Sequence, residues 1–360
     1  MRIAILWTEL SGYLNACLKE LAGRPGVELF VGHQVSSQDA PFALSQFEWI
    51  ENRMMWRDQR SLRGIANRLK EFNPDVMVFS GWHVRGYRDA ARAFKGKAWR
   101  VMTMDNCWLG TLKQMLAVIA APAFPRPLAD AVWVSGERQA VFARKLRFEQ
   151  RVILNGLYSC DSSAFHAARL ERIADGNTRE RKFLFVGRLA PEKGIRVLAQ
   201  AYSAYRARVS APWPLICCGT GSMETVLDGQ PGIEMTGFIQ PSELPRLMSS
   251  AACLVLPSDF EPWAVVVHEA ACTGLPVLAS NRVGSAIHLV QPGYNGYLFD
   301  SQDTEGLAGL MQAMTEMSEQ NWRKMSDASF QLSHQYSTER WADILLEGYA
   351  MAMSADSVSR

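Results

Sequence analysis

The sequence predicts an α/β protein made of two doubly wound domains, each with a parallel sheet. Short apolar runs typical of buried strands alternate with helical segments along the whole chain. Glycine, proline and polar residues punctuate the junctions between these runs. The 360 residues exceed one ordinary core and suit two domains of about 150 to 200 residues each.

Composition excludes several classes of protein. The chain is 48% hydrophobic and 21% charged, as expected of a globular protein. Its 38 basic and 36 acidic residues leave a net charge of +2, so no overall field favours nucleic acid as a partner. No apolar run reaches the roughly 18 residues that cross a bilayer, and the N-terminus turns polar too early for a signal peptide. We expect a cytoplasmic protein.

The seven cysteines lie mostly in apolar runs and form no Cys-x-x-Cys pair, which favours a reduced setting. His268 and Cys272 are four residues apart and can in principle share a metal ion. No further ligand lies nearby in the sequence, so we expect no metal site.

In the first half of the chain, apolar runs and breakers define the elements. We expect strands over residues 2–7, 27–32, 75–80, 100–104 and 151–154, and helices over about 13–21 and up to residue 72. Asn73-Pro74 ends the second helix, because proline disfavours helical backbone in the residue before it. The stretch from 33 to about 60 is polar and contains tryptophan.

Three loops that follow strands of the first half carry candidate site residues. They contain Gly12, His83 and Asp105. In open parallel sheets, ligands bind beyond the carboxyl ends of the strands. His83 can equally be a surface histidine of an ordinary turn, and Asp105 can cap a helix that begins near Thr111.

Residues 108–128 are apolar apart from Lys113 and Arg126, and a basic helix follows them. Such a segment can lie against an anionic bilayer surface. We favour the alternative, a core helix beside a solvated basic one.

The second half repeats the alternation of strands and helices after a hinge between about residues 155 and 181, in which residues 166–181 are read as irregular. We expect strands over 183–186, 215–218, 233–236, 253–256, 277–279 and 296–299, and helices over 199–209, 244–250, 265–273, 304–316, 321–332 and 339 to about 353.

Residues 259–280 are the stretch around which the second half is organised. A strand runs into a Pro-Ser-Asp loop, and Gly274 ends the helix that follows. Glu261 lies in the loop and Glu269 lies about two turns into the helix, on much the same side. Two carboxylates there suit a polyhydroxylated ligand, because an ionised carboxylate accepts two hydrogen bonds from a diol. The plainer alternative is two solvated glutamates.

Three further loops carry features that suit an anionic ligand. Residues 187–194 supply the cations Arg188 and Lys193 before a helix start. Gly219 and Gly221 allow close approach of the backbone, and Gly284 and Ser285 precede a short helix whose free amides can bind a phosphate oxygen.

These motifs resemble those of a known family. Glu261-Pro-x5-His-Glu269-Ala-x3-Gly-Leu-Pro-Val resembles the donor-site signature of the retaining GT-B glycosyltransferases of family four, also called glycosyl transferases group 1, and residues 187–194 match its Gly-Arg-Leu-x3-Lys-Gly pattern. The resemblance implies a GT-B fold of two Rossmann-like domains that face each other across a cleft. Residues 1–158 would be the acceptor-side domain, 159–338 the nucleotide-sugar domain, and 339–360 a helix that crosses back.

The resemblance also implies roles for residues. Arg188 and Lys193 would bind the diphosphate, Glu269 the ribose diol, and Glu261 the hydroxyls of the sugar. Asp105 would lie against the transferred sugar, with His83 in the acceptor-side wall. The base would lie near Phe238 and Ile239, and Trp263, Ala264, Gly12, Gly284 and Ser285 complete the expected contacts. Gly12 follows serine where the family usually has a second glycine, and Ala264 and Ser285 each replace a usual glycine.

The implied reaction is retaining transfer of a sugar from a UDP- or GDP-sugar to a hydroxyl of a glycan or lipid-linked acceptor, in polysaccharide biosynthesis. The chain has no Asp-x-Asp metal motif, so we expect the reaction to need no metal. The protein would be cytoplasmic, and a lipid-linked acceptor would allow peripheral contact with the inner membrane surface. One alternative is an inverting GT-B transferase or sugar-nucleotide epimerase, which can recruit His83 or Asp105 as a base. The other is a catalytically silent sugar-nucleotide-binding protein.

Overall fold

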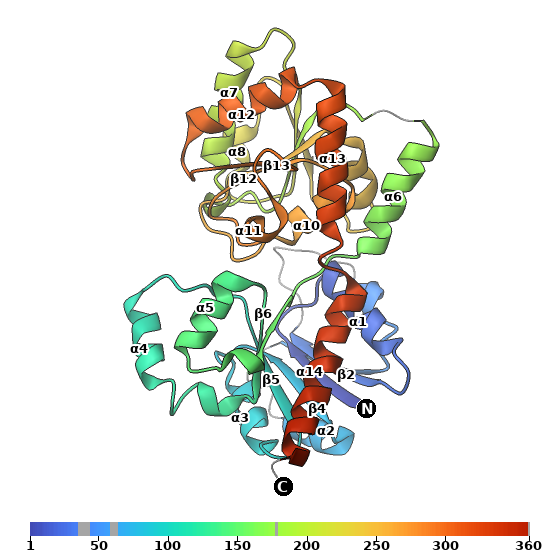
Figure 1. Cartoon of the computed structure of the whole chain (residues 1–360), viewed down its shortest axis with the longest axis vertical. Coiled ribbons are helices and arrows are strands. Elements are labelled where there is room, and N and C mark those ends of the chain that lie inside the picture. Colours follow the sequence, from blue (N-terminus) through green and yellow to red (C-terminus); the bar gives the residue numbers. More distant parts are fainter. Residues whose placement is uncertain (35–43, 58–63, 177–178, 359–360) are drawn as a thin grey trace. The chain divides into compact units, whose positions relative to one another are not determined.

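The computed structural model describes residues 1–34, 44–57, 64–176 and 179–358. The chain divides into two compact units (Figure 1). The first unit comprises Met1–Ser159 with Thr338–Arg360, and the second comprises Cys160–Ser337. The boundaries expected from the sequence lie one residue from these.

The first unit is built on a fully parallel sheet. Its described strands run in the order β3-β2-β1-β4-β5-β6-β7. They are β1 (Arg2–Trp7), β2 (Glu28–Gln34), β3 (Asn52–Trp56), β4 (Val76–Ser80), β5 (Trp99–Met104), β6 (Ala131–Val134) and β7 (Ile153–Asn155). The helices are α1 (Gly12–Ala22), α2 (Ile65–Phe72), α3 (Arg85–Ala93), α4 (Leu112–Ala120), α5 (Glu137–Lys145) and α14 (Thr338–Val358).

Both faces of this sheet are buried. Along β1, Ile3 and Ile5 join one core and Ala4 and Leu6 join the other, because successive side chains of a strand point to opposite faces. This explains why the strands read as continuous apolar runs.

Helix α14, from the end of the chain, completes the core of the first unit. The Trp341 indole donates to the Leu157 carbonyl oxygen at 2.7 Å and lies 4.7 Å from the Trp133 ring. Arg24 forms an ion pair of 2.9 Å with Asp343. The C-terminal segment is therefore an integral part of the unit that begins the chain.

The second unit has a similar parallel sheet. Its described strands run in the order β10-β9-β8-β11-β12-β13. They are β8 (Phe183–Val186), β9 (Leu215–Cys218), β10 (Ile233–Gly237), β11 (Cys253–Leu256), β12 (Val277–Ser280) and β13 (Gly296–Phe299). The helices are α6 (Ser162–Ala174), α7 (Ile195–Arg208), α8 (Glu224–Leu227), α9 (Leu244–Ser250), α10 (Val265–Cys272), α11 (Ala286–Leu289), α12 (Thr304–Glu316) and α13 (Glu319–Ser333).

Two groups of helices cover the sheet of the second unit. Helix α7 packs against α12, and α10 packs against α6 and α13 (Figure 1). The α/β fold class with two doubly wound units, predicted from the alternation of elements, is confirmed.

Helix α6 and strands β3 and β6 differ from the sequence-based expectation. Residues 162–174 form helix α6 rather than an irregular hinge, and the Asp161 side chain caps it by accepting from the Ala164 amide at 3.3 Å. Strands β3 and β6 were not expected. Each is short, and the sequence around β3 lacks a strong apolar pattern.

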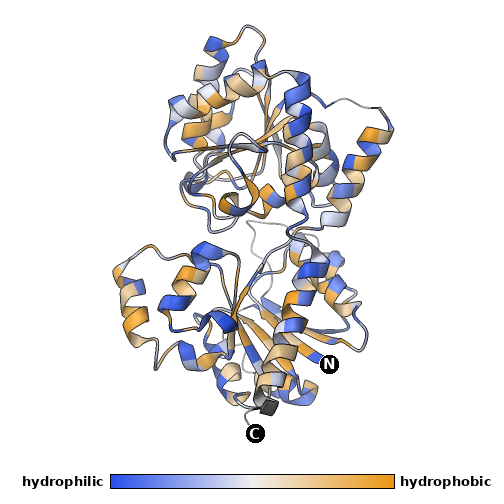
Figure 2. Cartoon of the chain, in the orientation of Figure 1, coloured by the Kyte–Doolittle hydropathy of each residue, from blue (hydrophilic) through white to orange (hydrophobic). Residues whose placement is uncertain are grey.

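Helix α4 is an amphipathic helix with an exposed apolar face, so the favoured expectation of a core helix is wrong. None of its residues is buried. Leu112, Met115, Leu116 and Ile119, spaced to share one side, are 77%, 42%, 66% and 75% exposed. Figure 2 shows the helix largely in hydrophobic colours. Among the described residues, no helix is long and apolar enough to span a membrane.

Helix α10 begins at a strained residue. Ala264 precedes the helix with φ 75° and ψ 85°, in the left-handed region that disfavours residues with a β-carbon. Its carbonyl oxygen accepts a 2.9 Å bond from the Ser285 hydroxyl, which helps to hold this conformation. The backbone geometry gives a physical reason for the glycine that the resembling family usually has here.

Replacing Ala264 with glycine should therefore stabilise the protein. Removing the strain of the left-handed backbone should raise the free energy of unfolding by about 1–2 kcal/mol. The greater conformational freedom of glycine in the unfolded chain should lower it by roughly 0.4–1 kcal/mol. Urea denaturation should show a net gain of about 0.5–1 kcal/mol. The matched control, Ala167→Gly at an exposed interior position of α6, should lose about 0.5–1 kcal/mol. Equal losses in both variants would show that Ala264 is unstrained.

Candidate functional site

The topology of each sheet marks where a ligand can bind. The strand order reverses between β1 and β4 in the first unit and between β8 and β11 in the second. At such a point the following loops leave toward opposite faces and open a crevice beyond the carboxyl ends of the strands.

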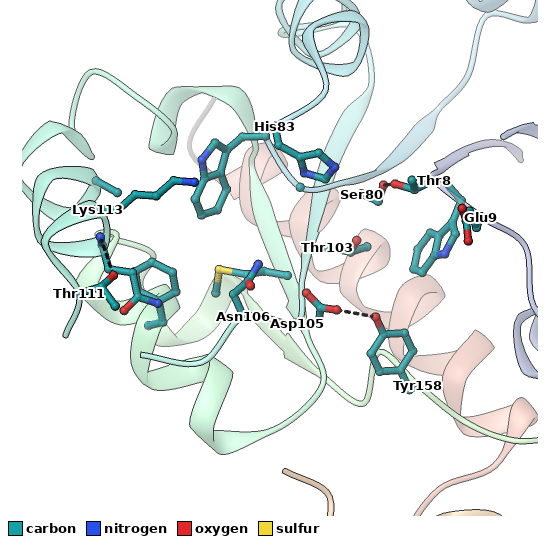
Figure 3. A pocket seen from close by; sticks show the side chains of 17 residues that line it. Thr8, Glu9, Ser80, His83, Thr103, Asp105, Asn106, Thr111, Lys113 and Tyr158 are labelled. Carbon is teal, nitrogen blue, oxygen red and sulfur yellow. Dashed lines mark hydrogen bonds between the residues drawn. The ribbon is translucent and has the colours of Figure 1, made fainter. Parts of the chain in front are cut away.

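In the first unit a cavity of about 630 Å³ lies at this point (Figure 3). Loops after β1, β4 and β5, with helices α4 and α5 and the segment after β7, supply its walls. The lining residues include Thr8, Glu9, Ser80, His83, Thr103, Asp105, Asn106, Lys113 and Tyr158.

Asp105 is held firmly at the wall of the cavity. Its Oδ2 accepts a 3.2 Å bond from the Tyr158 hydroxyl (Figure 3), and its carbonyl oxygen accepts a 3.1 Å bond from Gln139. Burial and the neighbouring Asp105 charge raise the pKa of Tyr158, so the phenol stays a donor. The alternative role of Asp105 as a helix cap is wrong, because Thr111 caps α4 through the Gln114 amide.

His83 also lines the cavity, and Gly12 does not. The exposed His83 comes from the loop before α3. Gly12 instead forms the first residue of α1, which Ser11 caps by accepting from the Leu14 amide at 3.4 Å.

Sequence reasoning missed several polar groups of this cavity. Thr8 and Ser80 bond to each other at 2.9 Å from adjacent strand ends, and Tyr158 comes from the segment after β7. The signal for Thr8 and Ser80 was their place at the ends of β1 and β4. Nothing in the local sequence pairs Tyr158 with Asp105, 53 residues earlier.

In the second unit, the loops after β8 and β11 are locked together. Gly194 has φ 69°, and a β-carbon there would lie 2.0 Å from the Pro257 carbonyl oxygen. The Glu192 carbonyl oxygen accepts bonds of 2.9 and 3.3 Å from the amides of Asp259 and Phe260. Only glycine at position 194 allows this approach.

This contact brings together two residues that the sequence assigned to the donor. Lys193 Nζ forms an ion pair with the Glu261 carboxylate, and their side chains are 16% and 12% exposed. Arg188 bonds to Glu192 at 3.0 Å, and its side chain is 58% exposed. The site therefore holds a shielded ion pair, Lys193 with Glu261, and a second cation, Arg188, that is more exposed to solvent.

Glu269 lies on α10, eight residues after Glu261. In the described part of the chain its carboxylate accepts no protein hydrogen bond, and the residue keeps partial exposure. Burial of the carboxylate raises its pKa to about 7, although the charge of His268 opposes the shift. A desolvated carboxylate with free acceptor capacity can receive hydroxyl donors from a ligand.

The glycine-rich loop after β9 serves loop packing. A β-carbon on Gly219, with φ 139°, would lie 1.9 Å from the Gly187 carbonyl oxygen. The Gly219 amide donates to the Gly237 carbonyl and the Gly221 amide to Glu224, at 2.8 Å each. This loop is therefore fixed between the loops after β8 and β10.

The amides of Gly284 and Ser285, which directly precede α11, are used in loop packing. Gly284 donates to the Glu261 carbonyl oxygen at 2.9 Å and Ser285 to that of Trp263 at 2.8 Å. The Trp263 indole is 3% exposed and lies 5.5 Å from the Tyr336 ring, so it is a packing residue. Gly284 and Ser285 thus position the loop that carries Glu261.

Phe238 and Ile239 directly follow β10 at the same edge of the sheet and are partly exposed. Their position at a strand end is the one expected of residues that contact a nucleotide base, and this role stays a prediction.

Comparisons with known proteins match most of the second unit to a known family. Residues 169–330 match the family model described as glycosyl transferases group 1. An uncharacterized glycosyltransferase of Methanocaldococcus jannaschii is 32% identical over 136 residues, which are 36% of this chain and 34% of that protein. A GDP-mannose-dependent α-mannosyltransferase of Corynebacterium glutamicum is 26% identical over 259 residues, 67% of this chain and 59% of that protein. The chain thus spans less than two thirds of the length of either relative.

Among solved structures, Anabaena HepE in complex with UDP superposes with a TM-score of 0.74 at 17% identity, covering 98% of this chain and 100% of that one. This similarity shows the fold. Residues 169–330 therefore form a glycosyl transferases group 1 domain, and the chain as a whole has the GT-B fold.

Proposed function

We propose that this protein is a retaining glycosyltransferase that moves a sugar from a nucleotide diphosphate sugar to a hydroxyl of a glycan or lipid-linked acceptor. The observation that carries the proposal is the arrangement of Lys193, Glu261 and Glu269 beyond the strand ends of a glycosyl transferases group 1 domain. A shielded cation beside a carboxylate suits a phosphate next to a sugar, and a second carboxylate suits a ribose diol.

Lys193 and Arg188 would stabilise the diphosphate leaving group. As the bond between sugar and diphosphate breaks, negative charge grows on the departing oxygen. Lys193 and Arg188 stabilise that charge, and a preorganised Lys193 gains most because its surroundings are partly desolvated. In this proposal the two cations do the work that a divalent metal does in other transferases, so turnover needs no added metal.

Glu261 has two partners in this scheme. It holds Lys193 in place and orients hydroxyls of the transferred sugar. The acceptor hydroxyl attacks on the face from which the diphosphate departs, which retains the anomeric configuration. No side chain is assigned as a covalent nucleophile.

The cavity of the first unit takes the acceptor in this proposal. Asp105 is positioned by Tyr158 and Gln139, and His83 and Lys113 lie on the wall, so hydroxyl and anionic groups both find partners there. Relatives and structural neighbours differ in donor: one relative is described as GDP-mannose-dependent and one neighbour holds UDP. A turnover screen across UDP- and GDP-sugars therefore tests the proposal.

We also propose that helix α4 rests on an anionic membrane surface inside the cell. Its exposed apolar face carries four large side chains, with Lys113 on the same helix. Lys145, on α5, lies 4.7 Å from the Trp108 ring just before α4. Apolar residues flanked by cations suit the boundary between lipid headgroups and acyl chains.

The two glutamates should respond differently to substitution. Glu261→Gln should lower turnover about 100-fold, because one preorganised contact of the reacting sugar is lost. It should leave binding of the free nucleoside diphosphate unchanged or tighter, since Lys193 loses its competing carboxylate. Glu269→Gln should weaken the binding of both the free diphosphate and the intact donor about tenfold or more. Calorimetry and turnover on both variants give the measurement.

The exposed Glu171→Gln substitution on α6 is the matched control and should change neither quantity. Equal losses of diphosphate affinity in the Glu261 and Glu269 variants would place Glu261 in the nucleotide site. Turnover that survives both substitutions would overturn the proposed donor site.

Membrane binding should depend on α4. In vesicle flotation, the wild-type protein should bind vesicles that contain anionic lipid. The double variant Leu116→Glu/Ile119→Glu should bind them about tenfold or more weakly, because charged side chains replace apolar area that would be buried in the membrane. The matched control is Leu170→Glu/Ile173→Glu on α6, where the side chains are 61% and 50% exposed. Equal binding by both double variants would contradict a role for α4.

A further inference from the structure

A cluster of two thiols and an imidazole lies in the interior of the second unit. Cys160, His268 and Cys272 are 0%, 1% and 0% exposed, and one ligand atom from each lies within 4.8 Å of the others. Cys160 begins the second unit, whereas His268 and Cys272 lie one turn apart on α10. The proposed donor site uses none of these side chains.

The separation of the two sulfur atoms fits a shared metal ion. Cys160 Sγ and Cys272 Sγ are 3.7 Å apart. A disulfide needs about 2.05 Å. Tetrahedral zinc with Zn–S bonds of about 2.3 Å places its sulfur ligands about 3.8 Å apart. The two thiols therefore already have the spacing of zinc ligands.

The orientation of His268 suits a metal ligand. Its Nε2 lies 3.0 Å from the Ser333 carbonyl oxygen, to which it donates. That bond fixes the tautomer in which Nδ1 carries a lone pair, and Nδ1 accepts a 3.3 Å bond from the Cys160 backbone amide, which a bound metal ion would replace. Histidines that bind metals commonly donate their other ring N–H to a carbonyl oxygen in this way.

A second histidine, on α6, lies beside the cluster. The His166 Nε2 is 3.3 Å from the hydroxyl of Ser333, the residue whose carbonyl oxygen accepts from His268. A set of two sulfur and two nitrogen atoms is one that zinc favours in closed, tetrahedral sites.

We propose that Cys160, Cys272 and His268 hold a structural zinc ion and that the neighbouring His166 ring turns to supply the fourth ligand. A set of four protein ligands leaves no open position, so the ion holds structure and takes no part in sugar transfer. It ties the first residue of the second unit and α6 to α10, the helix that carries Glu269. Local sequence does not reveal this cluster, because Cys160 is 108 residues from His268.

Metal analysis of the wild-type protein, purified without chelator or metal-affinity resin, tests this proposal. We expect about one zinc per chain, and a lower thermal midpoint after the zinc is removed. Cobalt added to the metal-free protein should give the intense visible absorption of a tetrahedral thiolate site. Cys160→Ser and Cys272→Ser should lose the zinc, and Cys253→Ser, at a buried cysteine of β11, should keep it.

The cobalt spectrum of the wild-type protein decides the matter even when a serine variant fails to fold. Absence of zinc together with absence of the cobalt spectrum would overturn the proposal. Zinc retained by Cys272→Ser would also overturn it. So would a mass two hydrogens lower than expected for free thiols, since it would identify a Cys160–Cys272 disulfide.

Discussion

The close approach of Gly194 to the Pro257 carbonyl is the constraint on which the candidate donor site depends. It joins the loops after β8 and β11, the two strands where the order of the second sheet reverses. Lys193 is thereby brought to Glu261, and these two residues are 68 positions apart in the chain. A side chain at position 194 would push the loops apart and separate the cation from the carboxylate.

Much of the fold follows from local sequence patterns. The strands of both sheets are mostly buried apolar runs, so β8, β9, β11 and β13 match their expected bounds. The edge strand β3 was missed because it contains asparagine and arginine and is only partly buried. Helix α6 was missed because its many charged residues were read as an irregular segment, and Asp161 was not recognised as the residue that caps the helix.

The candidate site was predictable in its residue types and less so in its contacts. Loops at strand ends, two glutamates and two cations indicate a polyhydroxylated, anionic ligand, and the resemblance to the family implies that this ligand is a sugar nucleotide. The pairing of Lys193 with Glu261, of Asp105 with Tyr158 and of Cys160 with His268 depends on tertiary packing. The same packing uses the amides of Gly284 and Ser285, and local sequence does not show which carbonyl oxygens they bind.

The most direct test of the account is the pH dependence of donor binding. Burial raises the pKa of Glu269 to about 7, and a ribose diol favours the ionised form, so binding should release a proton. Calorimetry with a nucleotide sugar, whose diphosphate bridge does not titrate near neutral pH, should show affinity about tenfold weaker at pH 6 than at pH 8. Glu269→Gln should bind more weakly and with a flat profile. The same pH profile in both proteins would show that Glu269 does not hold the donor.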